Sequence, residues 1–137
     1  MRILLIATNR HNRLQSRMNA QPLPIGLAYI AGHIDPERHE LKVLDLMFSG
    51  EDYLETVENT VVEFQPDLVG ISLRNLSNHS YLNTQWALPL TKAVIDRVRE
   101  NTSAPVVCGG PAFSILPEEC FEFLGVAGRR RLQYDVL

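Results

Sequence analysis

Cysteine is scarce in this sequence. Only Cys108 and Cys120 are present, and they form neither a C-x-x-C pair nor part of a C-x-x-x-C-x-x-C triplet. Two cysteines are too few to hold an iron–sulfur cluster or another cysteine-ligated metal centre. Such sparing use of cysteine is typical of a reducing compartment, so we expect a cytoplasmic protein.

An excess of positive charge and a long apolar run are also missing. The chain has 13 Lys and Arg against 16 Asp and Glu, whereas nucleic-acid-binding domains usually present a basic face. No apolar run approaches the roughly 20 residues that a membrane span needs. The apolar start at 1–6 is too short for a signal peptide, and no small-residue cleavage site follows it. We therefore expect no nucleic-acid partner and no membrane span.

The sequence instead alternates between short apolar runs and helical patterns, within a length of 137 residues that fits one domain. Alternation of this kind implies a parallel sheet with helices on both faces. We predict an α/β fold, a flavodoxin-like (Rossmann-like) three-layer sandwich with a parallel sheet of four to five strands in the order 2-1-3-4-5. Strands are expected at 3–7, 39–46, 68–73 and 105–108, and helices at about 25–34, 52–64, 83–100 and 117–125.

A ligand of such a sheet binds at the carboxyl ends of the strands, near the switch point between the first and third strands. The loop after the first predicted strand runs from about Thr8 to Leu23, whereas such loops typically have about two to six residues. It contains neither G-x-G-x-x-G nor G-x-x-x-x-G-K-[ST], and no Ser/Thr-rich phosphate loop. A long loop without a phosphate cradle indicates a ligand other than a simple nucleotide.

Small residues follow the third and fourth predicted strands. Ser72 ends the third, where its hydroxyl leaves space and offers a hydrogen bond. Gly109 and Gly110 end the fourth, and glycine lets a bulky ligand approach the backbone closely. Together these residues predict a slot between strands that suits a large ligand tail.

Three phrases at these strand ends resemble the cobalamin-binding domains, and in particular those of the cobalamin-dependent radical SAM enzymes, including the Mg-protoporphyrin monomethyl ester cyclase group. The wider family carries Asp-x-His-x-x-Gly, then Ser-x-Leu, then Gly-Gly; Gly26, Ser72 and Gly109 stand at similar intervals here. The Asp and His are missing before Gly26, and Ser72 begins Ser-Leu-Arg. The phrases are PLPIGLAYIA (22–31), PDLVGISLRN (66–75) and PVVCGGPAFS (105–114).

The resemblance implies that the chain binds cobalamin with its own base displaced and without a protein histidine on the cobalt. It implies a missing radical SAM domain as partner, and a parent methyltransferase or cyclase that also uses a 4Fe-4S cluster and S-adenosylmethionine. The isolated chain would then not be catalytic. His11, in the first loop, is a weak alternative as axial ligand. The expected cofactor-binding residues are Thr8, Asn9, Arg10, Pro24, Gly26, Ser72, Leu73, Arg74, Asn75, Gly109, Gly110 and Pro111.

Two other functions of the same fold remain open: a receiver-type signalling domain and a flavin-binding carrier. A receiver needs an acidic pair after the first strand and an aspartate after the third, where this chain has Thr8-Asn9 and Ser72. A flavin carrier needs the phosphate loop that is missing. Incubation with cobalamin or with flavin distinguishes these possibilities by colour.

Three further features receive a structural interpretation. Trp86 is expected to pack in the core, with a lid on the corrin as the alternative, and Cys108 is expected to be a small buried strand residue. Asp45 to Gly50 imitates the Asp-x-His-x-x-Gly motif with Met47 in place of His, but it follows the second strand and is interpreted as chance. We expect residues 1–125 to form the cobalamin-binding domain and 126–137 an atypical tail, either a fifth strand or the end of a truncation.

Overall fold

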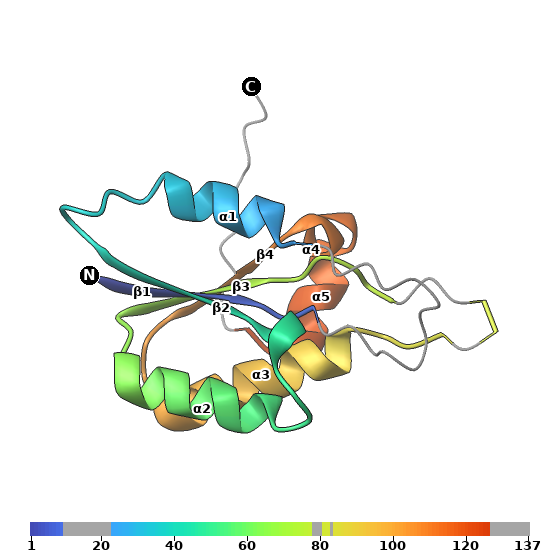
Figure 1. The fold of residues 1–137 in the computed structure, drawn as a ribbon. Helices are drawn as coiled ribbons and strands as arrows, with labels where there is room; N and C mark the ends of the chain where they lie inside the picture. The colour runs from blue at the N-terminus through green and yellow to red at the C-terminus, as the bar shows by residue number, and fades with distance from the viewer. Residues whose placement is uncertain (10–22, 78–80, 83, 127–137) are drawn as a thin grey trace.

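The computed structural model describes residues 1–9, 23–77, 81–82 and 84–126. Its centre is a parallel sheet in the order β2-β1-β3-β4 (Figure 1). This order confirms the predicted 2-1-3-4 arrangement. A fifth strand is not present among the described residues, and most of the tail expected to form it lies outside them. The strands are β1 (Arg2–Ala7), β2 (Glu40–Asp45), β3 (Leu68–Ser72) and β4 (Val106–Gly109).

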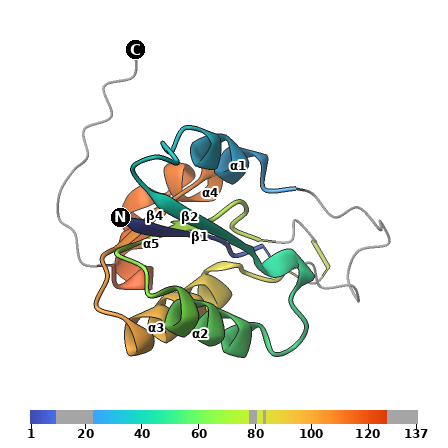
Figure 2. The ribbon, with the colours of Figure 1, turned by 60° about the vertical axis from the view of Figure 1, so that its left-hand side comes forward.

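Helices cover both faces of the sheet, which makes the predicted three layers. Two of them, α1 (Ile25–Gly32) and α4 (Pro111–Ile115), lie on one side, and the other three lie on the opposite side (Figures 1 and 2). Those three are α2 (Tyr53–Phe64), α3 (Leu88–Asn101) and α5 (Pro117–Leu124). No helix in the described ranges is long and apolar enough to cross a bilayer.

The two faces of the sheet bury very different amounts of apolar surface. Because side chains alternate along a strand, Leu4 and Ile6 point to the large core beneath α2, α3 and α5. Ile3, Leu5 and Ala7 point to the other face, where Leu27 is the one buried residue of the short helix α1. The α1 face is therefore only partly covered by the described residues.

Local sequence signals explain most of the helix boundaries. Val57, Val61 and Phe64 form the buried stripe of α2, as their spacing predicts. Helix α5 begins at Pro117 and ends before Gly125, which has a φ of 62°, as expected of a C-terminal glycine.

Two short elements were not predicted, and one helix starts later than predicted. Helix α4 and the 3-10 helix η1 (Leu46–Phe48) are too short to show a periodic pattern. Helix α3 begins at Leu88 because the preceding chain folds back on itself: the N–H of Ala87 donates to the carbonyl of Leu76 at 2.8 Å.

Candidate functional site

The carboxyl ends of three strands meet at one edge of the sheet. In the pairing of β1, β3 and β4, Ala7 lies beside Ser72, and Ser72 lies beside Gly109. The residues that the sequence places at strand ends are therefore neighbours in space. This edge is the candidate site (Figure 1).

Thr8 fixes the geometry of this edge. Its hydroxyl donates to the carbonyl of Ser72 at 3.1 Å and lies 3.1 Å from the hydroxyl of Thr91 on α3. Thr8 and Thr91 are 3% and 0% exposed, so their hydroxyl groups are committed to each other and to the strand end. Thr8 thus holds the ends of β1 and β3 and the helix α3 together. Sequence reasoning missed Thr91; its one signal is a hydroxyl on the face of α3 that also carries Val94 and Val98.

The two adjacent glycines have different roles. Gly110 has a φ of 107°, and a Cβ there would lie 2.5 Å from the carbonyl oxygen of Leu73. Gly110 is therefore required by the backbone itself, because the turn into α4 passes against the end of β3. A Cβ on Gly109 would meet no atom within 4 Å. Of these two glycines, only Gly109 leaves open space in which a ligand could lie.

The open space continues along the α1 face of the sheet. Val107 precedes Gly109 by two residues on β4 and therefore shares this face with it. Its partner Gly70 on β3 adds no open space, because a Cβ there would lie 2.7 Å from the side chain of Leu5. Val107 is 50% exposed. We call the surface formed by Val107 and Gly109 the open strip. Sequence reasoning identified only Gly109 of these two.

Arg74 follows β3 and brings an unsatisfied donor to the site. Its Nη1 atom is buried and has no hydrogen-bond partner among the residues that the structure describes. A buried donor without a partner is costly, and more so when it is charged. A ligand with a carbonyl or phosphate oxygen at this position would satisfy it.

The other predicted site residues differ in what they can contribute. Leu73 has its side chain in the core and its N–H and carbonyl bonded to Gly109 and Ala112. Pro24 uses its carbonyl to accept from Ala28 at the start of α1. Gly26 is exposed, with no atom within 4 Å of an added Cβ. Asn9 and Asn75 are half-buried and Pro111 is exposed, whereas Arg10 and His11 lie outside the described residues.

Neither cysteine is suited to ionise at neutral pH. Burial raises the pKa of Cys108 to about 11, only partly offset by the positive charge of Arg99. Burial also raises the pKa of Cys120, and the charge of Glu119 adds to the rise. A protonated thiol is a poor nucleophile and metal ligand. In the described ranges, no group of three His, Cys, Asp or Glu side chains could hold a metal ion.

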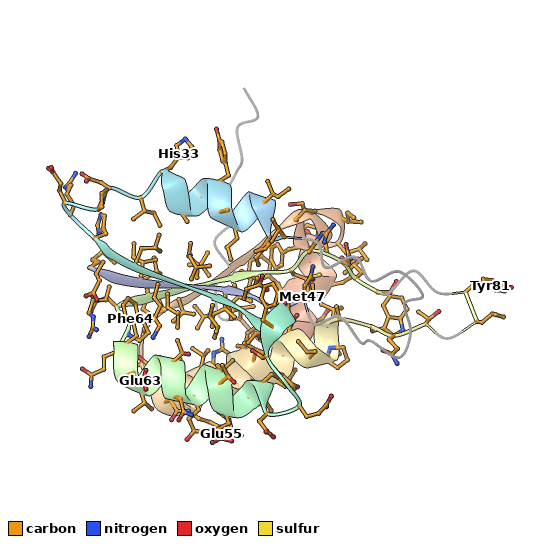
Figure 3. The ribbon with its side chains drawn as sticks, in the orientation of Figure 1. His33, Met47, Glu55, Glu63, Phe64 and Tyr81 are labelled. Carbon is orange, nitrogen blue, oxygen red and sulfur yellow. The ribbon has the colours of Figure 1, made fainter. Side chains whose placement is uncertain are left out.

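Two structural interpretations made from the sequence have different outcomes. The carboxylate of Asp45 accepts from the N–H of Met47 at 3.0 Å and caps η1, which gives Asp45 a local role at the end of β2; Figure 3 labels Met47 there. The expectation that Trp86 packs in the core is wrong, because Trp86 is 62% exposed. The chain reversal before α3 turns it outward.

Comparison with known proteins gives consistent matches. The family model described as B12 binding domain matches residues 18–131. A tryptophan 2-C-methyltransferase from Streptomyces laurentii is 34% identical over 103 residues, which cover 75% of this chain and 17% of that protein.

Two solved structures of TsrM from Kitasatospora setae, a radical S-adenosylmethionine methyltransferase, are 27% identical and match 91% of this chain. One contains tryptophan substrate and the SAM analogue aza-SAM, with a TM-score of 0.79 and 22% of that chain covered. The other contains cobalamin and a [4Fe-4S] cluster, with a TM-score of 0.78 and 21% covered. The present chain thus spans about a fifth of these relatives.

Proposed function

The chain belongs to the B12 binding domain family, and from that premise we propose that it holds base-off cobalamin at the carboxyl edge of its sheet, as the cofactor domain of a larger radical SAM methyltransferase. The open space at Gly109 is the observation that carries the proposal for the site. Alongside it, the family match supports the cofactor, and the TsrM structure with cobalamin bound supports the arrangement.

The residues of the site fit the chemistry of cobalamin. The nucleotide tail would lie on the open strip, where Gly109 leaves room for a bulky group. Arg74 would donate its unpartnered Nη1–H to an amide carbonyl or phosphate oxygen of the cofactor. Ser72 would contribute its hydroxyl, and Asn9 and Asn75 would bind polar groups at the rim. When bound, the cofactor would supply a cobalt centre that can carry a methyl group.

We propose that this chain binds the cofactor and that other parts of a longer protein carry out the reaction. The matched relatives are methyltransferases about four times as long as this chain, one of them with a [4Fe-4S] cluster. The cluster, S-adenosylmethionine and substrate would be bound by the other parts of such a protein. Residues 1–125 would then keep the cofactor in place, and a methyltransferase is favoured over a cyclase as the parent enzyme.

The direct test is retention of cobalamin by the purified chain. We expect a mixture with hydroxocobalamin to give a red or orange protein fraction after desalting, with an absorbance spectrum typical of the base-off form. Free flavin mononucleotide in a parallel sample should pass entirely into the small-molecule fraction. If all the cobalamin also passes into that fraction, the proposed function of this chain is wrong.

A second prediction concerns the lower axial position of the cobalt. Residues 12–32 contain no histidine, and no acidic residue lies between Met1 and Ile34 to orient the ring of His11. We therefore expect the electron paramagnetic resonance spectrum of the reduced Co(II) form to lack splitting by a protein nitrogen-14 nucleus. Splitting that disappears in the His11→Ala variant would contradict the prediction and identify His11 as the axial ligand.

A further inference from the structure

Trp86 is a large apolar side chain held at the surface beside the candidate site. It is 62% exposed, although burial of an indole is among the largest apolar gains that one residue can make. Its neighbours do pack inward: Leu76, Ala87 and Leu88 all lie against the main core. Trp86 therefore points outward from a segment whose neighbouring side chains pack against the core.

The backbone around Trp86 is fixed at two points. Trp86 forms an antiparallel bridge with Ser77, and the N–H of Ala87 donates to the carbonyl of Leu76 at 2.8 Å. The indole is thus presented from a closed reversal of the chain. Preorganisation of this kind lowers the entropy that an aromatic contact loses on binding.

The same two points place Trp86 next to the site. Ser77, its bridge partner, follows Arg74 by three residues, and Arg74 directly follows Leu73 at the end of β3. On its other side, Trp86 precedes α3, whose Thr91 contacts Thr8 at the end of β1. Trp86 is therefore attached on both sides to the edge where the strands end.

From this placement we propose that Trp86 is a positioning residue for the macrocycle, with its indole packed against the corrin. The inference rests on the proposed binding of cobalamin. A corrin is broad, conjugated and bordered by methyl groups, so it offers an indole an apolar surface of matching size. Contact with it would remove from water the side chain that the fold leaves exposed.

The affinity of variants tests the proposal. We expect Trp86→Ala to weaken cobalamin binding about tenfold, the usual order for losing an aromatic platform beneath a flat ligand. Trp86→Phe should stay within about threefold of the parent chain, because a ring remains. Tyr81→Ala is the matched control: Tyr81 is 99% exposed and projects at the far end of the same loop (Figure 3), so its removal should change nothing.

Nuclear magnetic resonance gives a readout that a general loss of structure would not imitate. Trp86 is the single tryptophan of the chain, so its indole signals are assigned without ambiguity. We expect nuclear Overhauser effects between the indole protons and corrin methyl groups in the diamagnetic Co(III) complex. Thermal melts of the variants should match the parent chain, since the side chain adds little to the core.

The outcomes separate the two proposals. Failure of the parent chain to retain cobalamin would overturn both. Retention of cobalamin with equal affinity by Trp86→Ala, or without Overhauser effects to the indole, would overturn the role of Trp86 alone. Equal losses in Trp86→Ala and Tyr81→Ala would also overturn it, because the effect would then belong to the loop as a whole.

Discussion

Replacement of Gly110 by alanine should destabilise the fold by about 3 kcal/mol, a large share of the 5–15 kcal/mol typical of a domain. Gly110 has φ 107° and ψ 168°, a region that only glycine adopts readily and that costs about 1–3 kcal/mol for other residues. The added Cβ would also lie 2.5 Å from the carbonyl oxygen of Leu73, and overpacking costs about 1–3 kcal/mol more.

Chemical denaturation of the chain without cofactor measures this effect. Gly32→Ala is the matched control, because Gly32 ends α1 and an added Cβ there meets nothing within 4 Å. We expect that control to be neutral or to stabilise the fold by up to about 1 kcal/mol. A Gly110→Ala variant as stable as the parent chain would show that the turn between β4 and α4 is not under this constraint.

Replacement of the adjacent Gly109 by valine should have the opposite pattern: a stable fold with poor cobalamin binding. A Cβ on Gly109 meets no atom within 4 Å, and the residue lies in β4, where valine is a favoured side chain. The added isopropyl group would instead fill the space proposed for the nucleotide tail. Since overpacking costs about 1–3 kcal/mol, we expect a loss of affinity of at least about tenfold.

Absorbance titration with hydroxocobalamin measures the affinity, and thermal denaturation without cofactor checks the fold. Val107→Ile serves as a graded control: it adds one methylene further along the open strip, and we expect a smaller loss. If Gly109→Val binds as tightly as the parent chain, the tail does not pass over β4. The two glycine variants together distinguish loss of the site from loss of the fold.

Local pattern was sufficient to predict the fold and the edge of the sheet that carries the site. Apolar runs and helical stripes with a proline or glycine at their ends predict the strands and four of the helices, because these signals depend on neighbours in sequence. The alternation of strand and helix then leaves few topologies, and the ends of parallel strands necessarily meet at one edge. Ser72 and Gly109 were brought together for this reason.

Only the tertiary structure decided which of these residues serve the fold and which are available to a ligand. Gly109 and Gly110 are adjacent glycines that the sequence does not distinguish. They differ in the space around them, because the backbone of Leu73, distant in the chain, lies against Gly110 and leaves Gly109 open. Thr8 is committed to Thr91 through the packing of α3, and Trp86 is exposed through the bridge to Ser77. Contacts between distant segments determine how deeply each group is buried and which of its hydrogen bonds remain free for a ligand. No local pattern of residues encodes these contacts.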